Sequence, residues 1–199
     1  MSKREEDAED PSLKAEAVVS AGRSALIEAM FGAGWLGWGL GEAGMFAGAA
    51  GPAFGFLALF FWACSIYTIR KGRLLRKQYP PVPDSTRQSV RRSFFIVVLI
   101  EVLAVAFVFI LSNQIHRRDL GADWCAMVVG LHFLPLAKLF RSARLGIIGI
   151  LITLWCGLCW ALFRSNALVI WVSLGTGTLL WAGSVAAMFR ARKIAHSLS

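Results

Sequence analysis

The sequence predicts an all-α protein, a polytopic membrane helical bundle of six transmembrane helices with both chain ends in the cytoplasm. Three observations lead to this fold class. Of the 199 residues, 57% are apolar and 17% are charged, whereas soluble domains hold about 45–50% and about 25%. The apolar residues gather in long runs, and the basic residues gather at the ends of those runs. A water-soluble fold could not bury so many long apolar runs.

The six spans are located by the length of the apolar runs. A helix needs about 20 apolar residues to cross a hydrocarbon core about 30 Å thick. The turn Gly41-Glu42-Ala43-Gly44 separates the first two runs, because one long helix would carry Glu42 through the bilayer at high cost. The expected spans, within a membrane domain of residues 25–189, are residues 25–42, 46–69, 93–112, 124–140, 145–163 and 167–189.

Both ends of the chain are polar. Residues 1–24 are expected to form a cytoplasmic tail, and residues 190–199 a basic cytoplasmic tail. Asp10 followed by Pro11 is typical of an N-cap and the first helical residue. A helix beginning near Ser12, in the cytoplasm or along the membrane surface, is therefore predicted to lead into the first span. The acidic start is the reverse of a signal peptide, so no cleavage is expected.

The basic residues predict the orientation. With six spans and a cytoplasmic N-terminus, 18 of the 21 lysines and arginines lie inside, while Arg117, Arg118 and Arg164 lie outside. This asymmetry follows the positive-inside rule. The net charge of +9 does not indicate nucleic-acid binding, which requires a basic face on a soluble domain. The basic loop of residues 70–92 is instead expected to meet anionic lipid headgroups.

Two ionisable residues fall near the middle of neighbouring spans. Glu101 lies in the third run and His132 in the fourth, and a short turn joins these two runs. Both side chains are therefore expected near mid-bilayer, within one or two helical turns of each other. Pro135 lacks an N–H, which frees the Leu131 carbonyl beside His132 and is expected to kink the helix. Such intramembrane groups mark solute paths and proton relays.

This polar intramembrane site gives the leading functional hypothesis, which is small-solute or proton-linked transport near Glu101 and His132. Glu28, at the cytoplasmic side of the first span, either lines an inner vestibule or simply reaches the interface. The alternative, from a different class, is a non-catalytic structural or interaction protein. In that case the polar pair only fixes helix packing.

A third hypothesis is a membrane thiol oxidoreductase. Cys156 and Cys159 form a CxxC whose thiols share one helix face, and Cys125 also lies toward the outer side. A CxxC indicates redox chemistry in a thioredoxin-like context, which this sequence lacks. Cysteine is also an ordinary small buried residue, so an enzyme is the less favoured class.

No metal and no other cofactor is expected. His116, Asp119 and Asp123 in the outer turn resemble a ligand set, but Arg117 and Arg118 between them oppose a cation. Asp123 is expected to N-cap the fourth span. His132 is the one histidine well inside a span, so paired axial ligands for a haem would need a second subunit.

Glycines four residues apart concentrate in the first two spans. Small residues at this spacing let helices approach closely. Two interpretations stay open, namely tight packing within one subunit and a homo-oligomer seam through these helices. The pairs are Gly37 and Gly41, Gly44 and Gly48, and Gly51 and Gly55.

Residues 130–137 read Gly-Leu-His-Phe-Leu-Pro-Leu-Ala. This run, together with the pattern of short spans, resembles small multi-pass bacterial membrane proteins that carry a domain of unknown function. The resemblance centres on His132 and Pro135. It implies a bacterial inner-membrane protein, and it implies no reaction, no substrate and no catalytic residue.

Overall fold

Six α-helices make up nearly all of the computed structural model, which describes residues 10–80, 84–140 and 142–198. In chain order they are α2 (Pro11–Glu42), α3 (Ala50–Arg76), α4 (Asp84–Gln114), α5 (Arg118–Leu139), α6 (Ala143–Leu162) and α7 (Ser165–His196). No strand occurs among the described residues. The predicted all-α helical bundle is therefore confirmed.

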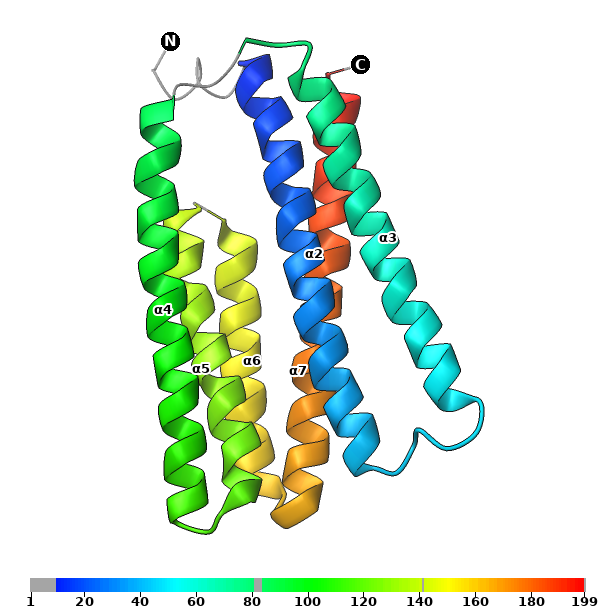
Figure 1. Ribbon diagram of the computed structural model, residues 1–199, viewed down its shortest axis with the longest axis vertical. Coiled ribbons are helices and arrows are strands. Elements are labelled where there is room, and N and C mark those ends of the chain that lie inside the picture. Colours follow the sequence, from blue (N-terminus) through cyan, green and yellow to red (C-terminus); the bar gives the residue numbers. More distant parts are fainter. Residues whose placement is uncertain (1–9, 81–83, 141, 199) are drawn as a thin grey trace.

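The helices run alternately up and down in one elongated bundle (Figure 1). α2 and α7 pack along each other at its centre, with α3 against them on one side and α5 and α6 against α7 on the other. α4 lies at the edge and packs only against α5 among the described helices. The start of α2 and the end of α7 lie at the same end of the bundle (Figure 1), called the termini end below, and the opposite end is called the far end.

Five of these helices are long and apolar enough to cross a membrane, which makes the chain a multi-pass membrane protein by composition and length. They are α3, α4 from Arg92, α5 from Leu120, α6 and α7. α2 is not among them, although the sequence predicts a first span at residues 25–42. Composition explains the difference, because α2 is rich in glycine and alanine and carries both Glu28 and Glu42.

α2 is one continuous helix from the expected tail into the bundle. Asp10 accepts a hydrogen bond from the Ser12 backbone N–H at 2.8 Å, as an N-cap does. Hydrogen bonds from the Ser12 side chain and backbone lower the pKa of the Asp10 carboxyl. Val18 and Val19 are buried, so one face of residues 11–24 packs against neighbouring helices, while Leu13, Ser20 and Arg23 are exposed. A position of this segment along the membrane surface stays a prediction.

Close helix contacts at the termini end depend on two glycines. A Cβ added at Gly22 would lie 2.9 Å from the Ile69 backbone N, and one added at Gly72 would lie 2.9 Å from the Val19 backbone N. α2 and α3 therefore touch backbone to backbone there. Val18 also packs with Ala191 and Ala195 of α7, which makes this end a three-helix unit.

The glycine pairs singled out in the sequence have other surroundings. Gly44 and Gly48 lie in the turn between α2 and α3 with φ of 68° and 67°, the left-handed region that glycine adopts without strain. A Cβ added at Gly55 would meet open space, and one at Gly37 would meet only Phe54 and Phe46 rings. These glycines are therefore not where the helices of one chain approach, and a homo-oligomer seam stays a prediction.

Some predicted features fall outside the described residues. These are the first nine residues, residues 81–83 of the basic loop and Arg141, together with the side chains of residues 84–91, Arg118 and Asp119. Of the basic loop, Arg70 and Arg73 on α3 are exposed. Contact of this loop with anionic headgroups stays a prediction.

Candidate functional site

One stripe of side chains on α4 forms its contact with α5. Val97, Val105, Val108 and Ser112 lie on the helix face toward α5, while most of the residues between them are exposed. Glu101 belongs to the same stripe and lies between Val97 and Val105, four residues from each. Helical spacing therefore turns the carboxyl group toward α5 and away from the exposed faces of α4.

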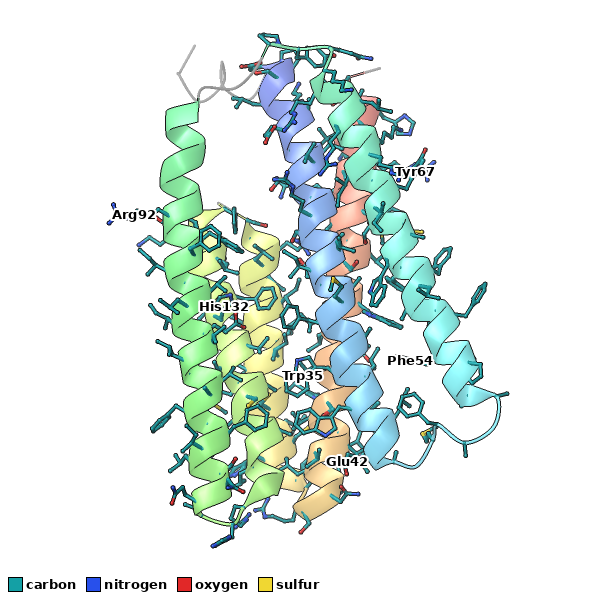
Figure 2. All side chains as sticks on the ribbon, in the orientation of Figure 1. Trp35, Glu42, Phe54, Tyr67, Arg92 and His132 are labelled. Carbon is teal, nitrogen blue, oxygen red and sulfur yellow. The ribbon has the colours of Figure 1, made fainter. Side chains whose placement is uncertain are left out.

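The structure brings the two mid-span ionisable groups together. Glu101 Oε2 lies 3.2 Å from His132 Nε2, with side-chain exposures of 17% and 9%. His132 lies on the side of α5 that meets α4 (Figure 2). The ring of Phe133 stands edge-on to the imidazole, with ring centres 6.3 Å apart. The pair thus joins the edge helix to the rest of the bundle through a contact between ionisable groups.

Pro135 lies inside α5, which runs through it as one helix from Arg118 to Leu139. The Leu131 and Pro135 side chains are both exposed. His132 is instead partly buried toward α4. The Pro135 side chain is therefore not part of the contact with Glu101. Proline has no N–H, so the Leu131 carbonyl beside His132 lacks its helical hydrogen-bond donor, and Pro135 acts on the site through that carbonyl.

Glu28 is the centre of a second charged site, near the middle of α2. Its carboxylate is 2% exposed and receives both arms of the Arg144 guanidinium, with Nη1 to Oε2 at 2.6 Å and Nη2 to Oε1 at 2.8 Å. The Ser24 hydroxyl donates to Oε1 at 2.6 Å. Arg144 also donates to the Gly183 carbonyl at 2.7 Å and to the Ser24 hydroxyl at 2.8 Å.

α7 makes room for this network at a glycine. A Cβ added at Gly183 would lie 2.5 Å from Glu28 Oε2 and 2.5 Å from Ile148 Cδ1. At the next residue of α7, the buried Ser184 hydroxyl donates to the Ala25 carbonyl at 2.8 Å. Three helices, α2, α6 and α7, therefore meet at this hydrogen-bonded ion pair, in which the Glu28 side chain is buried. A role for Glu28 in an inner vestibule or at the interface stays a prediction.

Arg144 is the residue that sequence reasoning missed. The sequence predicts a basic group in the cytoplasmic loop before the fifth span, whereas the structure makes Arg144 the second residue of α6 and turns it inward. The one signal available was that Glu28, placed in an apolar run, needs a cation or donor. A separation of 116 residues gives no periodic pattern that could select the partner.

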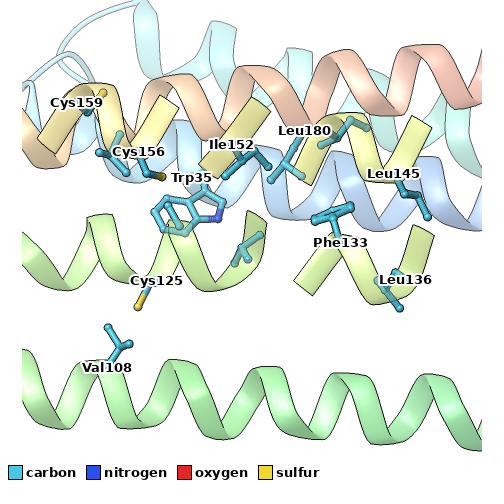
Figure 3. Packing of buried hydrophobic residues seen from close by; sticks show 14 of the residues in the cluster. Trp35, Val108, Cys125, Phe133, Leu136, Leu145, Ile152, Cys156, Cys159 and Leu180 are labelled. Atoms are coloured by element: carbon cyan, nitrogen blue, oxygen red, sulfur yellow. The ribbon is translucent and has the colours of Figure 1, made fainter. Parts of the chain in front are cut away.

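The three candidate redox cysteines are buried free thiols. Cys156 and Cys159 are fully buried in the core, and Cys125 is 4% exposed. Figure 3 shows Cys125 turned toward Val108 of α4, away from the α6 pair. Disulfide exchange requires that a thiolate reach another sulfur. The burial of all three thiols argues against the oxidoreductase hypothesis.

Asp123 does not cap its helix as the sequence predicts. α5 begins at Arg118, because the chain leaves α4 through a short turn in which His116 has a φ of 55°. Asp123 therefore lies in the second turn of α5 and is 1% exposed. Its Oδ1 has no hydrogen-bond partner among the described residues. Within these residues, no group of three or more His, Cys, Asp or Glu could hold a metal ion.

A groove of about 990 Å³ opens at the far end of the bundle. α2, α4, α5 and α7 all contribute to its walls, which mix apolar residues with amide, hydroxyl, imidazole and carboxyl groups. Neither Glu101 nor His132 is among the lining residues, which are Trp38, Glu42, Phe109, Ile110, Ser112, Asn113, His116, Gly121, Ala122, Ser165, Asn166 and Val169.

Comparisons of the chain with protein-family models, with curated proteins and with solved structures gave no match. The similarity of residues 130–137 to small bacterial membrane proteins therefore stays a resemblance. Fold and composition define the class, a multi-pass membrane protein built as a helical bundle. Its activity has to be inferred from the geometry of the polar groups inside that bundle.

Proposed function

We propose that this protein moves protons, alone or together with a small solute, across a membrane by means of Glu101 and His132. The observation that carries this proposal is the 3.2 Å contact between the two groups. Glu101 lies nine residues into the apolar part of α4, which begins at Arg92. At 1.5 Å per residue this is a depth of about 14 Å, near the middle of a core about 30 Å thick.

The chemistry of the pair suits proton transfer. A carboxylate and an imidazole at this distance can pass one proton between them, and histidine changes charge within the physiological pH range. Ionisable groups are rare in membrane spans and are concentrated along proton and ion paths. α4 packs only against α5 among the described helices, so the pair lies between an edge helix and its one neighbour.

A second candidate function, a structural or interaction role, is favoured by a different observation. The far-end groove is not lined by either member of the pair. In this role Glu101 and His132 attach the edge helix α4 to α5, and the exposed apolar surface of α4 contacts lipid. The two functions differ in whether the titration of Glu101 matters.

Proton flux into liposomes separates the two functions. Purified protein is reconstituted with a pH-sensitive dye inside, and a proton gradient is applied alone and with a panel of cations and small organic ions. We expect flux above that of empty liposomes. Glu101→Gln should abolish it, because the amide keeps the shape of the side chain but cannot titrate.

The matched control is Glu16→Gln, the same isosteric change at a carboxylate that pairs with Arg76 near the termini end. This variant should keep the flux of the parent protein. The transport proposal fails if the parent gives no flux across the panel. It also fails if Glu101→Gln conducts as well as the parent, and the structural role is then the one retained.

A further inference from the structure

One wall of the far-end groove continues into the bundle along α7. Val169 lines the groove, and Ser173 and Thr176 follow four and seven residues later on the same helix face. Both side chains are fully buried. Neither hydroxyl oxygen has a hydrogen-bond partner among the described residues, whereas Thr178 on the same helix donates to the Leu174 carbonyl at 2.7 Å.

Asp123 brings a carboxyl group to the same region from α5. Its Oδ1 is the third buried oxygen without a partner. Ala122, the residue before Asp123, lines the far-end groove together with Val169 of α7. The carboxyl group and the two hydroxyls are therefore buried beside this groove on two helices that pack against each other. Buried polar atoms in native proteins almost always have a partner, so three orphans in one place indicate an occupant.

The charge of Asp123 indicates which kind of ligand could bind beside these three oxygens. Among the described residues, no lysine or arginine forms a salt bridge with it. The basic residue of the α6 to α7 turn, Arg164, donates instead to the Trp160 and Phe163 carbonyls. Water would satisfy the two hydroxyls but would leave a buried negative charge uncompensated, which is strongly unfavourable.

We propose that Asp123, Ser173 and Thr176 bind a small monovalent cation of the Na⁺ type, which enters through the far-end groove. Carboxylate and hydroxyl oxygens are hard ligands that suit hard cations. Divalent sites use several carboxylates, whereas a single carboxylate balances a single positive charge. The carboxylate of Glu42 lines the groove and adds negative charge on the entry path.

This site is separate from the Glu101/His132 pair. Asp123 and His132 are nine residues apart on α5, which is two and a half helical turns, so they lie on opposite faces of the helix. His132 faces α4, so Asp123 lies on the side of α5 away from α4. A test of the cation site therefore does not depend on whether the Glu101/His132 pair carries protons.

The test is the thermal unfolding midpoint of the purified protein in detergent, followed by tryptophan fluorescence. NaCl replaces choline chloride stepwise at constant ionic strength. A ligand that binds only the folded state raises the midpoint in a saturable way, and we expect this for Na⁺. Asp123→Asn should abolish the response. Ser173→Ala and Thr176→Val should each weaken the apparent Na⁺ affinity by about tenfold or more, because each loses one ligand to a charged group.

Ser184→Ala is the matched control, since Ser184 is also a buried serine on α7 but donates to the Ala25 carbonyl. It should lower the midpoint and keep the Na⁺ response. The proposal is overturned if Na⁺ and choline act alike, or if Ser173→Ala responds to Na⁺ as the parent does. It is also overturned if infrared spectra at neutral pH show a protonated carboxyl band that Asp123→Asn removes, because Asp123 is then a neutral acid. If Asp123→Asn does not fold, the two hydroxyl variants decide the question.

Discussion

Two pairs of ionisable residues lie inside the described part of the bundle. Both pairs are largely buried, but they differ in the number of their hydrogen bonds and in the groups that they contact. Glu28 and Arg144 have side-chain exposures of 2% and 19%, and Glu101 and His132 of 17% and 9%. The first pair makes two ion-pair hydrogen bonds and recruits Ser24 and the Gly183 carbonyl. The second pair makes one contact at 3.2 Å.

The difference shows what each pair is suited to. In the Glu28/Arg144 pair, the bidentate geometry satisfies both carboxylate oxygens and fixes the position of the guanidinium. Arg144 also donates to the Gly183 carbonyl, so this pair ties α2, α6 and α7 together. The Glu101/His132 pair contains a histidine, the residue type whose ordinary pKa lies closest to neutral pH, and joins only two helices. The first pair therefore fits a structural role, and the second leaves room for chemistry.

The largest expected effect is the loss of Arg144. Arg144→Leu leaves the Glu28 carboxylate buried without its cation, which should destabilise the folded protein by about 3–5 kcal/mol. The free energy of unfolding in mixed micelles measures this cost. Glu28→Leu with Arg144→Leu should recover most of the loss, because no uncompensated charge remains.

Arg192→Leu is the control for that series, since Arg192 is an exposed arginine on α7. It should change the unfolding free energy by less than about 0.5 kcal/mol. A structural role for the Glu28/Arg144 pair would be contradicted if Arg144→Leu proved no more costly than Arg192→Leu.

An intermediate effect is expected at Gly183, because the Glu28/Arg144 pair occupies the space that a side chain at this position would fill. Gly183→Ala pushes a methyl group against Glu28 Oε2, in a carboxylate that three hydrogen bonds hold in place. Overpacking of this kind costs about 1–3 kcal/mol. Gly157→Ala is the matched change, because a Cβ there meets open space. It should be neutral or stabilising by up to about 1 kcal/mol. Equal unfolding midpoints for the two variants would contradict the close fit at Gly183.

The smallest effect is expected at the second pair. His132→Leu should cost about 0.5–1.5 kcal/mol, the range of polar contacts between membrane helices. In a double-mutant cycle with Glu101→Leu, the coupling energy should be of the same size. A coupling energy as large as that of Glu28 with Arg144 would remove the contrast between the pairs and make both structural.

The sequence alone predicts the class and much of the framework. Apolar runs and their basic ends indicate six helices in a membrane bundle, because span length and hydropathy are local properties. The contact between Glu101 and His132 also follows locally, since a short turn forces α4 and α5 to be antiparallel neighbours. Asp10 and Pro11 mark the start of α2 for the same reason, since capping involves residues adjacent in the chain.

Tertiary structure decided the rest, because it depends on which distant faces meet. Nothing near Glu28 in the chain selects Arg144 as its partner, and that choice required α6 to lie beside α2 and α7. The glycines at close helix contacts include Gly22, Gly72 and Gly183, each placed opposite a particular neighbour, and these are not the glycines with the clearest spacing. Asp123 became an inward-facing carboxyl group only because α5 begins at Arg118, several residues before the apolar run. The pattern of residues in the chain predicts the helices and their spans, whereas the partners of each buried residue depend on how the helices pack against one another.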